Sequence, residues 1–213
     1  MTTVAYLNGV LASDSLYHDG NGVDISVSRS NASELSPPKI VKYELGAFTL
    51  LCGCAGVSNL MAATQDFFVK NYGQLSHASY RKLVLDLPHY LDQYVTDSQR
   101  ECDKLLLEVI LVTCLETHVL RYNIQEKQFY LPDDQFPSIG SGSDAVKEIY
   151  NLSPLAPCVE IVSRAAKQDC CSGGEIVAVS LNDVSISNCR SGLIVNSQQR
   201  PIFLESLNTL MGI

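Results

Sequence analysis

The stretch that decides the fold is TTVAYLNGVLASD, residues Thr2–Asp14, which consists of two short apolar segments joined by Asn8-Gly9. Asn-Gly between two apolar segments is typical of a two-residue hairpin turn, because both residues tolerate positive φ. Such a turn places Asp14 across from Thr3. Ideal pleating would aim the side chains of Asp14 and Thr2 at opposite faces, so strand twist or fraying must bring them together.

A second hairpin is expected after a long polar segment. Residues 15–38 are rich in Ser, Asn, Asp and Gly and end in Pro37-Pro38, a composition typical of a loop or loose ribbon. The apolar segments Lys39–Tyr43 and Phe48–Gly53 then flank a turn at Gly46. This pattern predicts two more paired strands, the first of which opens with a lysine.

The rest of the chain alternates between helical and strand periodicity. Apolar spacing of three and four predicts helices over 60–72 and 80–95, with Pro88 expected to kink or split the second. Later segments predict, in order, strands over 105–114, 118–124 and 128–131, helices over 143–152 and 156–170, and strands over 175–181 and 184–187. Two antiparallel sheets stacked face to face, with helix pairs on both outer faces, would bury every apolar stripe. The predicted fold is therefore α+β, a four-layer αββα sandwich, formed by a single domain over residues 1–213.

Composition and charge argue against several classes of protein. Apolar residues make up 46% of the chain and charged residues 18%, an ordinary balance for a globular domain. The net charge of -8, without clusters of Lys and Arg, argues against nucleic acid as a partner. The opening segment lacks the features of a secretory signal, and the longest apolar run, Leu105–Leu115, is interrupted by Glu108 and too short to span a bilayer. We therefore expect a cytoplasmic protein without membrane or nucleic-acid partners.

The eight cysteines are expected to be thiols and not metal ligands. Cys52 and Cys54 lie in an apolar strand segment, and Cys170 and Cys171 are adjacent, but neither pair has His at zinc-like spacing. Cys52, Cys54 and Cys114 are predicted to be buried, because each lies in an apolar strand segment. We expect no metal and no cofactor.

Thr2 is a candidate nucleophile. If Met1 is removed, Thr2 carries a free α-amino group with a pKa of roughly 7.7–8.0, which can act as a base for the threonine hydroxyl. Asp14 could hold a lysine such as Lys39 nearby, and a cation beside the amine lowers the pKa of the amine and stabilises an alkoxide. The alternatives are that Asp14 caps a strand end and that Lys39 is a solvated lysine at a sheet edge.

Six segments in this order resemble the catalytic β subunits of the proteasome family, including its bacterial ATPase-dependent two-component relative. The resemblance covers nearly the whole chain and rests on TTVA at 2–5, ASDS at 12–15, PPKI at 37–40, LLCGCAG at 50–56, IGSGSDA at 139–145 and RAAKQDCCSGG at 164–174. It implies an N-terminal nucleophile hydrolase fold and a threonine endopeptidase that cleaves peptides or unfolded proteins inside a homo-oligomeric ring or stacked rings. It also leaves room for an ATPase unfoldase as a partner.

The resemblance assigns roles to the residues near the chain start. Thr2 resembles the nucleophile, its amine the general base, and Asp14 and Lys39 the ion pair that tunes them. Gly53 resembles the glycine whose N–H forms the oxyanion hole, and a glycine does allow a carbonyl to approach the backbone closely. Leu51, two residues earlier, resembles a residue that lines the first specificity pocket.

Three later residues complete the implied site. Ser141 resembles the serine that hydrogen-bonds the terminal amine, while Asp169 and Ser172 resemble the pair that supports it. The alternative for 140–143 is a strand-to-helix turn with a Ser N-cap, and the alternative for 172–174 is a helix C-terminus.

The sequence departs from the family in the charge network near Asp14. Leu16 stands where many relatives carry Arg, and His18 where they carry Thr or Ser. Three functional hypotheses therefore remain: a threonine peptidase in a ring assembly, a small-molecule amidase of the same fold, and a non-catalytic assembly or structural subunit. Retention of Met1 would block the amine and favour the last.

Overall fold

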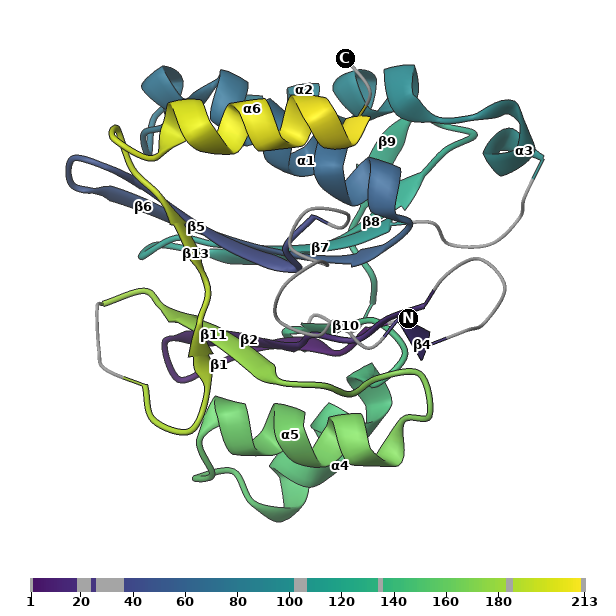
Figure 1. Ribbon diagram of the computed structural model, residues 1–213, viewed down its shortest axis with the longest axis vertical. Helices are drawn as coiled ribbons and strands as arrows, with labels where there is room; N and C mark the ends of the chain where they lie inside the picture. The colour runs from purple at the N-terminus through teal and green to yellow at the C-terminus, as the bar shows by residue number, and fades with distance from the viewer. Residues whose placement is uncertain are drawn as a thin grey trace.

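The chain forms a four-layer sandwich of helices, sheet, sheet and helices, as the computed structural model shows in Figure 1. The structure describes residues 2–18, 24–25, 37–101, 107–133, 136–182 and 186–211. The predicted α+β class and αββα layering are confirmed. Both sheets are mixed and not purely antiparallel, because the edge pairs β11–β12 and β13–β5 are parallel. Among the described residues, the helices fall short of the length and apolar character that crossing a membrane needs.

The first sheet is built on the opening hairpin. Asn8 and Gly9 have φ values of 51° and 82°, the positive values that a tight two-residue turn requires. The sheet follows the order β10 (Ser138–Ile139), β1 (Val4–Leu7), β2 (Val10–Asp14), β11 (Ile176–Ser180) and β12 (Arg190–Ser191). Its outer face is covered by α4 (Ser143–Leu152) and α5 (Cys158–Gln168).

The second sheet is built on the second hairpin, which turns at Gly46 (φ 58°). Its order is β13 (Leu193–Val195), β5 (Ile40–Leu45), β6 (Phe48–Gly56), β7 (Leu107–Val112), β8 (Thr117–Asn123) and β9 (Gln128–Tyr130). The covering helices are α1 (Ser58–Lys70), α2 (Tyr80–Leu91) and α6 (Arg200–Met211). Smaller elements are β3 (Tyr17–His18), β4 (Asp24–Ile25), α3 (Asp97–Arg100) and the 3-10 turns Tyr72–Gln74 and Asp92–Tyr94.

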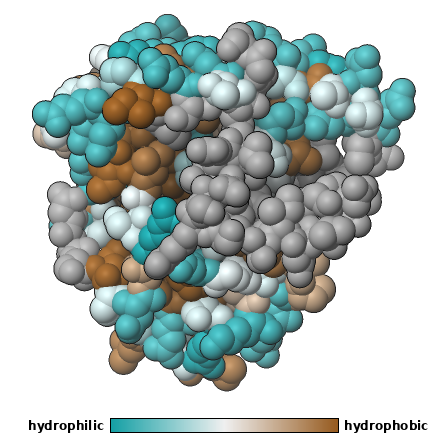
Figure 2. Space-filling view, in the orientation of Figure 1, coloured by the Kyte–Doolittle hydropathy of each residue, from teal (hydrophilic) through white to brown (hydrophobic). Residues whose placement is uncertain are grey.

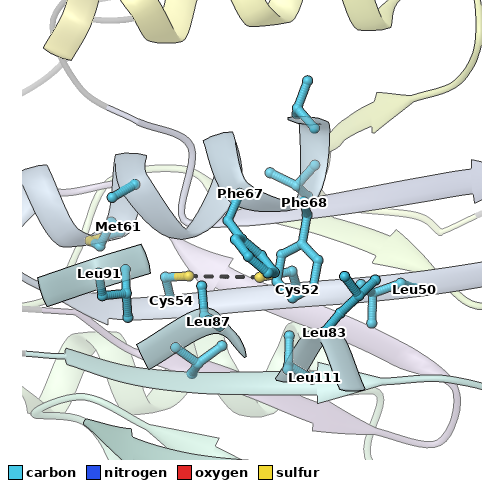
Figure 3. Close-up of a cluster of buried hydrophobic side chains, with 14 of the residues drawn as sticks. Leu50, Cys52, Cys54, Met61, Phe67, Phe68, Leu83, Leu87, Leu91 and Leu111 are labelled. Atoms are coloured by element: carbon cyan, nitrogen blue, oxygen red, sulfur yellow. Dashed lines mark hydrogen bonds between the residues drawn. The ribbon is translucent and has the colours of Figure 1, made fainter. Parts of the chain in front are cut away.

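The buried side chains form one apolar layer between the sheets and one under each helix layer. Val4, Leu11 and Ile110 belong to the layer between the sheets. Cys52 and Phe68 belong to the layer under α1 and α2, part of which is drawn in Figure 3. Each fully buried apolar side chain contributes about 1.5–3 kcal/mol relative to exposure, so these layers hold the two hairpins at a fixed separation.

Two expectations about local structure need correction. The helix over Pro88 is not split: α2 runs through this buried proline, because core packing by Leu83, Leu87 and Leu91 outweighs one missing hydrogen bond. Cys114 is exposed and not buried, because β7 ends at Val112 and the chain turns over 113–116. Cys52 and Cys54 are buried, as predicted.

The C-terminal helix α6 was not foreseen. It packs against α1 in the outer layer, and the proline at its second position, Pro201, is a helix-start signal that the sequence does contain. The strand expected over 184–187 falls partly outside the described residues, and 186–187 are not in a strand.

Candidate active site

Lys39 is buried against Asp14. Lys39 is 4% exposed and Asp14 is fully buried. The Lys39 Nζ donates to Oδ1 of Asp14 at 3.0 Å, to Oδ2 at 3.1 Å and to the Leu16 carbonyl at 2.5 Å. Burial lowers the pKa of Lys39, and the negative charge of Asp14 opposes that lowering. A solvated lysine at a sheet edge, the alternative drawn from the sequence, is therefore excluded.

The Asp14 carboxylate turns back onto the start of its own hairpin. Asp14 donates its N–H to the Thr3 carbonyl at 3.1 Å, the cross-strand position that the turn predicts. Its Oδ1 accepts the Thr3 N–H at 2.7 Å, and its Oδ2 accepts the N–H groups of Gly173 at 3.0 Å and Leu16 at 3.3 Å. The peptide between Thr2 and Thr3 is thus held directly on the carboxylate that binds Lys39.

The two glycines of Gly140-Ser141-Gly142 pack against the first residues of the chain. A Cβ on Gly140, which has a φ of +86°, would lie 2.0 Å from the Thr2 carbonyl oxygen. A Cβ on Gly142 would lie 1.9 Å from Oγ1 of Thr3. Larger residues would displace the chain start. The expectation of a Ser N-cap here is replaced by Gly142 as the N-cap of α4.

Asp169 connects the two serines of the predicted site. It follows the last residue of α5, and its Oδ2 accepts hydrogen bonds from Ser141 Oγ at 2.5 Å and Ser172 Oγ at 2.6 Å. The Ser172 hydroxyl also contacts Oγ1 of Thr3 at 2.8 Å. Burial raises the pKa of Asp169, but the hydrogen bonds from both serines and from the Cys171 N–H outweigh it and leave the pKa lowered.

The structure therefore joins five of the seven predicted residues, Asp14, Lys39, Ser141, Asp169 and Ser172, in one hydrogen-bonded network that reaches Thr3, the residue after Thr2. Gly53 lies beside it, in the middle of β6, across from Ile40 on one side and Ile110 on the other. A Cβ on Gly53 would approach Val4 Cγ1 to 2.8 Å, so this glycine allows the two sheets to pack closely. Its suggested role in an oxyanion hole stays a prediction.

One residue that contacts the candidate site escaped the sequence reasoning. Glu108 accepts the Gly140 N–H at 2.8 Å through Oε2, while its Oε1 accepts from Arg121 Nε at 2.9 Å. An acidic residue inside an apolar strand was the available signal. Gly56 is exposed at the end of β6 with a φ of 141°, two residues before α1 begins at Ser58.

Two further details concern residues named from the sequence. Leu51 is fully buried between the sheets, which does not fit a residue that lines a specificity pocket. The side chain of His18 lies outside what the structure describes. Asp169, Cys170 and Cys171 have potential metal-ligand atoms within 4.8 Å of one another, but Oδ2 of Asp169 already accepts two hydroxyl hydrogen bonds.

Comparison by sequence finds no matching family model and no matching curated protein. Comparison of structures does find relatives of this fold. Anbu, the ancestral beta-subunit, from Yersinia bercovieri has a TM-score of 0.58 at 13% identity, covering 98% of this chain and 92% of its own. The eukaryotic HslV from Trypanosoma brucei has a TM-score of 0.54 at 13% identity, covering 84% and 97%.

A third solved structure, described as a helical assembly of the Anbu complex from Pseudomonas aeruginosa, has a TM-score of 0.54 at 11% identity over 99% of this chain and 95% of its own. At such identities the likeness concerns the fold. The chain thus has the four-layer fold that the HslV and Anbu structures share.

Proposed function

We propose that this chain is a threonine-type peptidase in which Thr2, once Met1 is removed, attacks the carbonyl of a peptide bond. The observation that carries the proposal is the buried Lys39–Asp14 pair bonded to the Thr3 N–H. Transfer of charged groups from water into a protein interior costs several kcal/mol per ion. Stability alone therefore does not explain why this buried ion pair is present. A nucleophile whose base needs an adjusted pKa explains it directly.

The proposed reaction uses the amine of Thr2 as its base. The amine takes the proton of the Thr2 hydroxyl while the oxygen attacks the carbonyl carbon. The positive charge of Lys39 lowers the pKa of the amine and stabilises the developing alkoxide. The ammonium then protonates the departing amine of the substrate, which leaves an ester on Thr2 that water hydrolyses.

Asp169 and its serines would hold the terminus in place. Asp169 fixes Ser172, whose hydroxyl touches Thr3, and also fixes Ser141, which follows the glycine packed on the Thr2 carbonyl. Locked side chains around a nucleophile keep it within the narrow range of positions that reaction requires. Ser141 and Ser172 are therefore proposed to position Thr2 and its amine.

We infer that Gly56 is a better candidate than Gly53 for the N–H that binds the oxyanion. Neighbouring residues of a strand direct their N–H groups to opposite sides. The Cys54 N–H donates to the Lys39 carbonyl at 2.8 Å, so the Gly53 N–H points away from Lys39, toward β7. By the same alternation, the Gly56 N–H points to the side of β6 on which Lys39 lies. Gly56 is the last residue of β6 and lies past the point at which Ile40, the first residue of β5, pairs with β6. A preorganised N–H there would stabilise negative charge on the reacting carbonyl oxygen.

We also propose that the chain, working as one domain over 1–213, self-associates. The Pseudomonas aeruginosa Anbu structure of the same fold is a helical assembly. In this chain Leu85 of α2 is 73% exposed and Ile202 of α6 is 69% exposed, and Figure 2 shows apolar surface on the left of its face, near β13. Light scattering at micromolar concentration should give a mass of several chains. A single species near the chain mass of 23.3 kDa would contradict self-association.

Turnover of a fluorogenic peptide by variants of Thr2 tests the proposed activity. Thr2→Ala should remove all turnover without unfolding the protein, because it deletes the attacking oxygen. Thr2→Ser should keep part of the turnover, because the hydroxyl and the amine both remain. Turnover of small amides alone would indicate an amidase. Absence of turnover in a chain shown to begin at Thr2 would favour a structural subunit.

A further inference from the structure

Two adjacent thiols lie inside the segment that supports the candidate site. Cys170 and Cys171 occupy the positions between Asp169 and Ser172, and their sulfurs are 3.5 Å apart. Cys170 is exposed and Cys171 is half-buried. The hydrolysis proposed above uses neither sulfur.

The backbone of this segment holds two acidic residues of the site, Asp169 and Asp14. The Cys171 N–H donates to Oδ1 of Asp169 at 3.1 Å, and the Gly173 N–H donates to Oδ2 of Asp14 at 3.0 Å. The Gly173 carbonyl accepts from the N–H of Ser15 at 3.1 Å. Any rearrangement of the peptide groups over 170–173 therefore reaches the carboxylates that orient Thr2 and Lys39.

We propose that Cys170 and Cys171 form a redox modification site, at which a low-molecular-weight disulfide such as glutathione disulfide converts the two thiols into a disulfide and loosens the site. The exposed Cys170 thiolate attacks one sulfur of glutathione disulfide, forming a mixed disulfide and releasing one glutathione. The Cys171 thiolate then attacks the Cys170 sulfur and releases the second glutathione. Two protein thiols are oxidised and one glutathione disulfide is reduced to two thiols.

Covalent geometry explains why this bond disturbs its surroundings. The Cα atoms of adjacent residues are about 3.8 Å apart across a trans peptide, whereas those of disulfide-linked residues are usually about 4.4–6.8 Å apart. Ring closure must therefore distort the peptide between Cys170 and Cys171. The N–H of that peptide is the one that Asp169 accepts. A bond formed under such constraint is also readily reduced, which makes the modification reversible.

A second pair of cysteines in the same chain provides an internal control. The sulfurs of Cys52 and Cys54 are 3.8 Å apart, nearly as close, and the dashed line in Figure 3 joins them. Both residues are at most 1% exposed in the core under α1 and α2. Thiol exchange requires access of the oxidant to sulfur. Glutathione disulfide should therefore leave Cys52 and Cys54 reduced in the native protein.

The test is to incubate the native protein with glutathione disulfide, block remaining thiols and map the peptides by mass spectrometry. The peptide with Cys170 and Cys171 should lose two hydrogens, whereas Cys52 and Cys54 should take the blocking reagent only after unfolding. Peptide turnover should fall by about tenfold or more, as expected for a displaced positioning group, and dithiothreitol should restore it. In Cys170→Ser/Cys171→Ser the ratio of turnover with and without oxidant should stay at one, while Cys114→Ser should respond as the unmodified sequence does.

Hydrogen exchange distinguishes a failure of this inference from a failure of the proposed peptidase function. Of the readouts, only peptide turnover rests on the proposed function. Amides over 169–173 should exchange faster after oxidation. If the reduced protein cleaves no peptide, the proposed function fails, and the disulfide together with its exchange signature still decides the inference. Thiols that stay reduced or carry only bound glutathione would overturn it. A Cys170–Cys171 disulfide that leaves amide exchange unchanged would also overturn the inference. If the reduced protein cleaves peptide, turnover would have to be unchanged by the disulfide as well.

Discussion

The second sheet borders two buried regions of opposite character. Under α1 and α2, the face of β6 that carries Cys52 and Cys54 packs on Phe68 and Leu87 in an almost wholly apolar layer. Lys39, one residue before β5, is nearly as buried but is bonded to the Asp14 carboxylate and the Leu16 carbonyl. Burial of carbon supplies free energy of folding, whereas burial of charge consumes it. We therefore expect substitutions in the first region to change stability and substitutions in the second to change chemistry.

The largest effect is expected from Lys39→Met. Loss of the cation should lower peptide turnover about 10²–10⁴-fold, the range for a lost acid–base contribution. It should also lower the free energy of unfolding by about 3–5 kcal/mol, because Asp14 stays buried without its ion-pair partner. Turnover must be measured at a temperature where unfolding curves show the variant to be folded.

Lys42→Met is the matched control for Lys39→Met. Lys42 lies in β5, which begins one residue after Lys39; it is 2% exposed and pairs with Glu44 at 2.7 Å. Its loss should lower the stability but leave turnover per folded molecule near that of the parent. Equal loss of turnover in both variants would show that Lys39 has no special relation to the chemistry.

A smaller effect, confined to stability, is expected from Phe68→Ala. Phe68 is fully buried and its ring lies 5.5 Å from that of Phe67 and 5.7 Å from that of Tyr43. The cavity should lower the free energy of unfolding by about 3–5 kcal/mol, measurable by urea denaturation. Turnover per folded molecule should not change. A fall in turnover in the folded variant would mean that this layer controls the geometry of the site.

The smallest effect is expected from Asp169→Asn, and it should depend on pH. Although burial raises the pKa of Asp169, its hydrogen bonds hold the pKa below the ordinary value of about 3.9. The ionised carboxylate therefore stabilises the fold above about pH 4, and this contribution disappears as pH falls through the lowered pKa. We expect a deficit of about 1–3 kcal/mol at neutral pH.

The pH profile separates this account from a loss of packing. The deficit of Asp169→Asn should begin to shrink near pH 4 and approach zero only below the lowered pKa, where the folded parent carboxylate is protonated too. A constant deficit from pH 3 to 7, the approximate working range of such a titration, would mean that the charge of Asp169 contributes nothing.

The two regions also differed in how far the sequence predicted them. Apolar periodicity predicted α1 and α2 over the second sheet but not α6. Asn8-Gly9 predicted the register that puts Asp14 across from Thr3. Periodicity says nothing about a long-range polar contact such as Ser141 with Asp169, and only the resemblance suggested it. The roles of Gly140 and Gly142 depend on how closely the chain start packs against them, a distance that no local pattern encodes.

Mass spectrometry of the protein after treatment with a peptide epoxyketone tests the central claim most directly, because that reagent can bond to a hydroxyl and a neighbouring amine together. We expect the N-terminal peptide to begin at Thr2, without Met1, and to carry the inhibitor on both the hydroxyl and the amine. Thr2→Ala should give no such adduct. Inhibitor found on a cysteine, or peptide turnover by a chain that still carries Met1, would contradict the claim that Thr2 is the nucleophile.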